Sequence, residues 1–266
     1  MSGSSSLTAM LADLRPLGAR SVIASTLLGS STTSMPAERL VRTGELFGVA
    51  DGAIRTALWR MVAAGELVAD DGRYALAGPM LERRERFDTG PARRREWDGS
   101  WELAVVTAER RSAIERQDLR GSAAALHLAE LREGVWVRPD NLDRSRLPER
   151  QAVVDGQCVR FVTASLDGDR EALAARLFDL DIWAARARSL IEALDGAAGL
   201  PASLGPGDLA DGFRVSITAV RHLSVDPLLP DELLPPEWPG DALRRRYADY
   251  HTFFDERMAE WLNSGP

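Results

Sequence analysis

The sequence contains one cysteine, three histidines and no lysine. Cys158 cannot form a disulfide within the chain or build a cysteine metal cage, and the histidines lie far apart. The longest apolar runs are much shorter than a bilayer crossing requires, and no cationic flank precedes a hydrophobic stretch near Met1. These absences predict a non-exported, cytoplasmic protein without a zinc site, a Cys/His catalytic pair or a cofactor.

The charge of the chain is negative and unevenly distributed. A net charge of -7 argues at first against a nucleic-acid partner, because phosphate binding depends on cation density. Residues 1–90, however, carry 10 arginines against 10 acidic residues, whereas residues 101–266 carry 20 against 28. The balanced N-terminal segment would bind DNA only weakly as one copy, so a nucleic-acid partner would require a homodimer on paired half-sites.

The N-terminal segment combines three helical patterns with a hairpin pattern. Ser34 is expected to cap the second helix, because Pro36 follows in the first turn. Asp71-Gly72 suits a tight turn between two short apolar runs. This order of elements predicts a winged helix-turn-helix. The expected helices cover residues 17–29, 34 to about 47, and 51–64, and the expected strands cover 66–69 and 73–76.

The rest of the chain predicts an α+β, multidomain protein, since 266 residues with 45% hydrophobic composition exceed one ordinary core. Short strands are expected over 101–108, 135–137 and 159–162, with helices over 111–126 and from 173. Helical patterns over 182–194 and 243–261 flank a proline-rich loop. The predicted division is a winged helix-turn-helix at 1–77, a charged linker at 78–97, a central domain at 98–180 and a C-terminal helical domain at 181–266.

Three segments together resemble the PaaX-like family of bacterial transcriptional repressors, which control phenylacetate catabolic operons. They are residues 48–62, residues 97–101 with 134–139, and residues 226–235 with 238–240. The resemblance implies an N-terminal winged helix, a central ferredoxin-like domain and a C-terminal helical domain. It also implies a dimer whose DNA affinity falls when an aryl-acyl-coenzyme A such as phenylacetyl-coenzyme A binds. This sequence departs from the family pattern at Ala50, Gly52 and Trp59.

One face of the predicted third helix has the residue types that read a major groove. Arginine can donate two hydrogen bonds to guanine, and threonine can contact a thymine methyl group. Other arginines are placed to contact phosphates, which position the protein without specifying sequence. The alternative is an ordinary solvated face whose arginines pair with nearby acids. The candidate DNA-binding residues are Arg39, Arg42, Gly52, Arg55, Thr56, Trp59, Arg60 and Arg73.

An acyl-coenzyme A effector would need cations beside an apolar or aromatic slot. The candidate pairs are Trp136 with Arg138, and Arg221 with His222. The alternative for these residues is packing and salt bridging between domains.

No residue pattern indicates catalysis, and the protein is therefore predicted not to be an enzyme. The central domain resembles a small CRISPR-associated nuclease, but residues 103–107 of its first strand lack a metal-binding carboxylate. The leading hypothesis is a ligand-responsive repressor that binds operator DNA. The alternatives are a winged-helix protein-interaction module that has lost DNA binding, or an enzyme acting on a thioester or nucleic acid.

Overall fold

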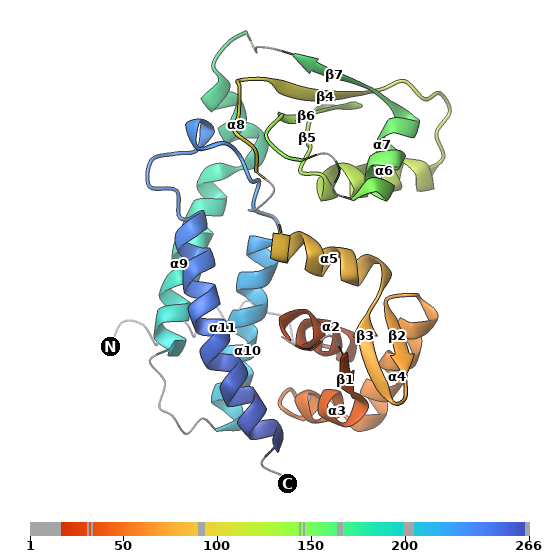
Figure 1. Cartoon of the computed structure of the whole chain (residues 1–266), viewed down its shortest axis with the longest axis vertical. Helices are drawn as coiled ribbons and strands as arrows, with labels where there is room; N and C mark the ends of the chain where they lie inside the picture. The colour runs from red at the N-terminus through yellow and green to blue at the C-terminus, as the bar shows by residue number, and fades with distance from the viewer. Residues whose placement is uncertain are drawn as a thin grey trace. The chain divides into compact units, whose positions relative to one another are not determined.

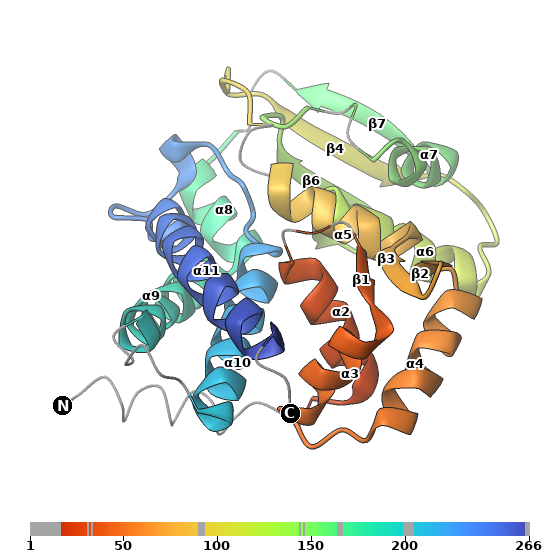
Figure 2. The ribbon, with the colours of Figure 1, turned by 60° about the horizontal axis from the view of Figure 1, so that its bottom comes forward.

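The computed structural model describes residues 17–30, 32, 34–89, 94–143, 145, 147–163, 167–198 and 205–263 (Figures 1 and 2). The chain folds into two compact units. The first unit combines the N-terminal segment up to Asp88 with residues 185–224 and the residues from Pro239 onward. The second unit contains residues 89–184 and 225–238. The C-terminal helices therefore pack in the same unit as the N-terminal helices.

The N-terminal part of the first unit contains the predicted helices and the predicted hairpin. The apolar positions expected on one face of the third helix, Ile54, Leu58 and Met61, are buried in a common core. Asp71 and Gly72 have positive φ, as a tight hairpin turn requires. The elements are α2 (Ala19–Gly29), β1 (Ser34–Pro36), α3 (Ala37–Glu45), α4 (Asp51–Ala63), β2 (Leu67–Asp70), β3 (Arg73–Leu76) and α5 (Gly78–Thr89).

The predicted role of Ser34 as a helix cap is wrong. Ser34 lies in strand β1, where it pairs with Ala75 of β3, and helix α3 begins three residues later with Pro36 as its N-cap residue. A residue before proline is sterically driven from the helical region, so Met35 takes an extended conformation. The sheet therefore has three strands, in the order β1-β3-β2.

Helices α3 and α4 approach each other closely at a glycine. A Cβ atom at Gly44 would lie 2.8 Å from Cγ1 of Ile54, which is too close for any side chain there. Glycine at position 44 therefore lets the Ile54 side chain pack directly against the backbone of α3. In Figures 1 and 2, α4 and the hairpin lie on the side of this unit away from α10 and α11.

Three long helices complete the first unit: α9 (Leu180–Ala198), which begins in the second unit, α10 (Pro206–Leu223) and α11 (Gly240–Asn263). Helix α10 contacts α2, and α11 contacts α3. The sequence analysis did not predict α10. Most of its residues from Leu209 to Leu223 are buried, polar ones such as Thr218 and His222 included, so the wide polar face of an ordinary surface helix is missing.

The second unit is built around a four-stranded antiparallel sheet with the order β5-β6-β4-β7. The elements follow one another as β4 (Trp101–Val106), α6 (Ala113–Ala125), β5 (Ala129–Arg132), β6 (Val135–Pro139), α7 (Pro148–Gln157), β7 (Cys158–Thr163), α8 (Arg170–Phe178) and the 3₁₀ helix η2 (Asp231–Leu233). Strand β5 and helix α7 were not predicted. Strand β5 is a short edge strand without a buried residue, and α7 begins after Leu147, which is in the left-handed conformation.

The two faces of this sheet have separate cores. Ala104 and Trp136 pack with Val154 of α7 in one core. Trp101 and Val137 pack with α8 and with Leu229 in the other. The proline-rich segment at 226–238 therefore belongs to the central unit, where it helps to cover one sheet face.

Candidate nucleic-acid interface and ligand residues

The outward face of helix α4 is exposed. The side chain of Trp59 is 71% exposed, and Arg55, Thr56 and Arg60 are exposed beside it. The Thr56 hydroxyl donates to the carbonyl oxygen of Gly52 over 2.7 Å. Nε of Arg55 lies 2.6 Å from Oδ1 of Asp51, one turn earlier on the same helix. Such an exposed pair is worth little, so Arg55 can exchange this partner for another at small cost.

Arg73 lies at the start of strand β3 and is held by strand β1. Its guanidinium donates from Nε to the Ser34 hydroxyl over 3.0 Å and from Nη2 to the Ser34 carbonyl over 2.8 Å. These two bonds join β3 of the hairpin to β1. The side chain is exposed, and it lies next to the turn at Asp71-Gly72.

The two arginines of helix α3 contact the end of α11. Nη2 of Arg39 donates to Oδ1 of Asn263 over 2.9 Å. Nη1 of Arg42 donates to the carbonyl oxygen of Leu262 over 3.2 Å, and its guanidinium lies 4.7 Å from the centre of the Trp261 ring. The sequence analysis missed these partners, which lie more than two hundred residues further along the chain.

Arg138 is a buried structural residue, with only 2% of its surface exposed. Its guanidinium donates to the carbonyl oxygens of Leu126, His127, Pro139 and Leu228. It also donates to Oδ1 of Asn141, whose own amide donates to the Leu228 carbonyl. Arg138 thus ties the segment after Asp226 to the sheet. Trp136, its neighbour, is buried in the core on the helix-covered face.

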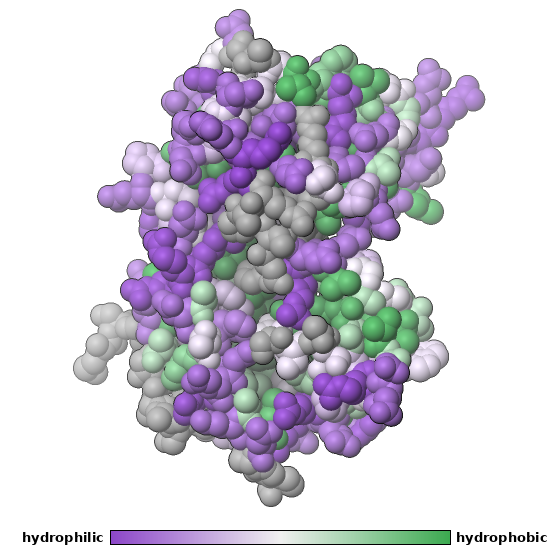
Figure 3. Space-filling view, viewed as in Figure 1, coloured by the Kyte–Doolittle hydropathy of each residue, from purple (hydrophilic) through white to green (hydrophobic). Residues whose placement is uncertain are grey.

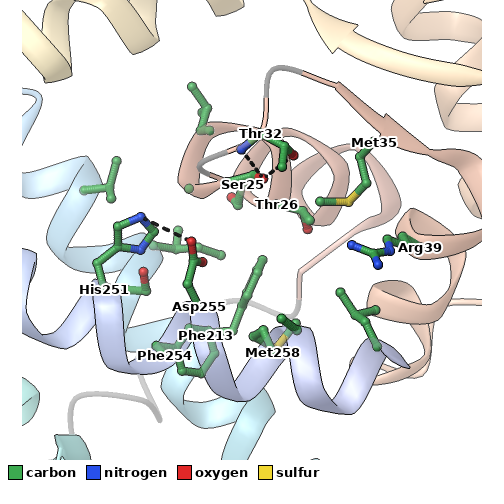
Figure 4. A pocket seen from close by; sticks show the side chains of 18 of the residues that line it. Ser25, Thr26, Thr32, Met35, Arg39, Phe213, His251, Phe254, Asp255 and Met258 are labelled. Carbon is green, nitrogen blue, oxygen red and sulfur yellow. Dashed lines mark hydrogen bonds and ion pairs between the residues drawn. The ribbon is translucent and has the colours of Figure 1, made fainter. Parts of the chain in front are cut away.

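The second candidate pair of ligand residues lies in the first unit. His222 is buried near the C-terminal end of α10, whereas Arg221 is exposed. Arg221 lines a cavity of about 340 Å³ between α2, β1 and α3 on one side and α10 and α11 on the other. Figure 4 shows Arg39 directed into the same cavity. The sequence analysis named both arginines but did not bring them together.

The one carboxylate of strand β4 has a structural partner. Glu102 of β4 is buried and forms an ion pair with Arg160 of β7, which also contacts Gln151 and Asp155. Burial lowers the pKa of Arg160 and raises the pKa of the Cys158 thiol. Within the described ranges, no group of three or more His, Cys, Asp or Glu residues is placed to hold a metal ion.

Comparison with protein-family models gives matches along nearly the whole chain. The model of the PaaX-like protein matches residues 18–79, that of the PaaX protein central Cas2-like domain matches residues 94–175, and that of the PaaX-like protein C-terminal domain matches residues 178–264. The chain belongs to the PaaX-like family. Members of this family are in general transcriptional regulators of phenylacetate catabolism and not enzymes.

A solved structure is also similar over most of the chain. The uncharacterized protein Rv0674 from Mycobacterium tuberculosis is 36% identical, and its structure matches with a TM-score of 0.65 over 91% of this chain and 98% of that chain. No curated protein matches the chain. Among the described helices of this PaaX-like chain, none is long and apolar enough to cross a membrane.

Proposed function

We propose that this PaaX-like protein is a winged-helix repressor that binds operator DNA. The observation that supports this proposal is the exposed outer face of α4, which carries two arginines, a threonine and a tryptophan on a helix whose opposite face is fully packed. Helices α2, α3 and α4 followed by a hairpin have the order of a winged helix-turn-helix, with α4 as the recognition helix.

Each candidate residue has a role in this proposal. Arg55 donates to a guanine edge in the major groove after leaving Asp51, and Thr56 contacts a neighbouring base. Arg60 and Arg73 contact phosphates, and the two α3 arginines contact phosphates when they leave α11. Gly52 and Trp59 shape the surface that faces the bases.

We propose that the protein binds as a homodimer held by the central unit, whose βαββαβ order is that of a ferredoxin-like domain. Strand β7 is an edge strand with an apolar face: Val159 is 46% exposed and Phe161 is 52% exposed. Figure 3 shows hydrophobic residues gathered over this strand. A second copy that covers β7 removes this apolar surface from water and places two recognition helices on paired half-sites.

In this proposal the helices and hairpin of the predicted domain 1–77 bind DNA, and the predicted central domain 98–180 holds the dimer. Within the predicted linker 78–97, residues up to Asp88 pack in the first unit, and within the predicted C-terminal domain 181–266, residues 225–238 pack in the second. An aryl-acyl-coenzyme A such as phenylacetyl-coenzyme A is the proposed effector that releases the operator. Arg138 and Trp136 are unsuited to contact it directly, because their side chains are buried and satisfied within the central unit.

The test is to recover the fragments that the purified full chain retains from fragmented genomic DNA of its source organism. The retained fragments are then titrated at several salt concentrations. A repressor retains a small set of fragments with a common inverted repeat, and its affinity falls steeply with ionic strength. Retention of no fragment would overturn the proposal and favour the protein-interaction alternative, which the exposed Trp59 also fits.

A further inference from the structure

The cavity between α2, β1 and α3 and helices α10 and α11 has the size and composition of a small-molecule site. Its volume of about 340 Å³ lies at the lower end of the range for such sites. Met35 of β1 faces Phe213 of α10 and two residues of α11, Phe254 and Met258, across an apolar interior (Figure 4). An aromatic or branched apolar group of modest size fits this interior.

The charged groups around the cavity favour an anion. Three arginines line it, Arg39 of α3, Arg83 of α5 and Arg221 of α10, against the carboxylates of Asp255 and Glu256. Asp255 lies 3.8 Å from Nε2 of His251, and Glu256 is an exposed residue.

Arg39 is the arginine best placed to bind that anion. Its head projects into the cavity near Met35 and Met258 in Figure 4. Within the described part of the chain its guanidinium makes one hydrogen bond, to Asn263, although it carries five N–H donors. Donors therefore remain for a carboxylate or a phosphate, which a guanidinium can bind through two parallel bonds.

We propose that this cavity binds a small molecule with an apolar, preferably aromatic, body and one anionic group, and that Arg39 binds the anion. The coupling to DNA rests on the proposed function, in which Arg39 contacts an operator phosphate. A ligand that holds Arg39 removes this phosphate contact, so ligand and operator weaken each other's binding by the same factor. The helices on both sides of the cavity belong to one compact unit, and ligand and DNA compete there for the same Arg39 side chain.

Two sources supply this chemistry. A free aromatic acid such as phenylacetate fits the cavity whole. A coenzyme A thioester is several times larger than its acyl group, so only its acyl end enters, while its phosphates contact cations at the rim. Phenylacetate and phenylacetyl-coenzyme A are therefore the two competitors in the experiment.

The first experiment measures ligand binding by the full chain without DNA. The probe is 8-anilinonaphthalene-1-sulfonate, an aromatic body with one anionic group whose fluorescence rises in an apolar site. Arg39→Gln should weaken binding of the probe by about tenfold to hundredfold, the range for a lost charged hydrogen bond. Gly29→Trp should fill the cavity and abolish binding, and it should fold because a Cβ there meets no atom within 4 Å. Arg188→Gln, on an exposed position of α9, is the matched control and should bind as wild type does.

Displacement of the probe by phenylacetate alone identifies a free-acid site, and displacement by phenylacetyl-coenzyme A identifies a site for the acyl end of the thioester. Absence of probe binding by the wild type, equal binding by all four proteins, or displacement by neither competitor overturns the proposed site.

The second experiment adds the displacing competitor to the complex of the protein with a retained DNA fragment. Wild type should lose DNA affinity when the ligand is added, whereas the DNA affinity of Arg39→Gln should be the same with and without the ligand. If the ligand binds and no fragment is retained, the cavity assignment holds and the proposed repressor function fails. If fragments are retained and the ligand leaves their affinity unchanged, the coupling through Arg39 is overturned.

Discussion

Helices α3 and α4 are consecutive, and each carries two arginines of the candidate DNA-binding set, yet their surroundings differ. Arg39 and Arg42 of α3 contact the last turn of α11 through hydrogen bonds and the Trp261 ring. Arg55 and Arg60 of α4 are exposed, and Arg55 forms an ion pair with Asp51 of its own helix. In the proposed complex the α4 arginines contact DNA without giving up a partner outside their own helix, whereas the α3 arginines must first leave α11.

In the proposed function this difference gives the two helices different tasks. A recognition surface needs side chains that are already free of strong partners, because each broken contact reduces the free energy of binding. Side chains with an alternative partner suit regulation, since a ligand can shift them between two sets of contacts. The α4 face fits the reading of bases, and the α3 arginines fit the response to a ligand.

The largest expected effect comes from comparing substitutions on the buried and the exposed face of α4. Leu58 is almost fully buried, and Leu58→Ala should lower the free energy of unfolding by about 2–5 kcal/mol through a lost core contact and a cavity. Trp59→Ala, one residue later on the exposed face, should change it by less than about 0.5 kcal/mol. Urea unfolding followed by circular dichroism measures both. A large loss of stability in Trp59→Ala would mean that its ring packs in the folded protein and is not a free surface group.

The contrast between the helices also shows what sequence patterns can predict. Helical spacing identified the buried face of α4, because Ile54, Leu58 and Met61 pack locally against α2 and α3. The same spacing marked the polar face of α3 but carried no information about Trp261 and Asn263, which cover it from the far end of the chain.

Two further features, helix α10 and the surroundings of Arg138, were not predicted from the sequence, for related physical reasons. From Leu209 onward, helix α10 is buried over most of its surface, polar residues included, and only a narrow strip with Asp211, Arg214 and Arg221 reaches solvent, so the wide polar face that marks a surface helix is missing. Its glycine at position 212 leaves room for the aromatic rings of Tyr250 and Phe254. Burial also raises the pKa of Tyr250.

Arg138 was expected beside a ligand. The structure instead gives its guanidinium five acceptors, four of them main-chain oxygens, and main-chain acceptors leave no signature in the sequence.

The second prediction tests whether α4 reads bases. Arg55→Ala should reduce discrimination between operator and random DNA by about 1–3 kcal/mol, or roughly tenfold to a hundredfold, because a guanine contact is lost. Arg73→Ala should weaken both complexes about equally, because it removes a phosphate contact. Gel-shift titrations with the two DNAs give the ratio. Equal losses on both DNAs in Arg55→Ala would place Arg55 at a phosphate and leave another residue to specify the sequence.

The third prediction has the smallest effect and tests the contact between Trp261 of α11 and Arg42 of α3. Trp261→Ala removes the ring beneath Arg42, and it should lower the free energy of unfolding by about 0.5–1 kcal/mol, the range for a cation–π contact that is not fully buried. In the proposed complex Arg42 leaves this ring for a phosphate, so losing the ring should raise operator affinity by roughly twofold to fivefold and leave the slope of log affinity against log salt concentration unchanged. Trp261→Phe keeps an aromatic ring under Arg42 and should keep the wild-type stability and affinity. Because the stability change and the affinity change have one cause, they should appear together in Trp261→Ala and be absent from Trp261→Phe. A loss of stability with an unchanged affinity would mean that Arg42 only holds α11 against α3, so that the α3 arginines are structural and recognition belongs to α4 alone.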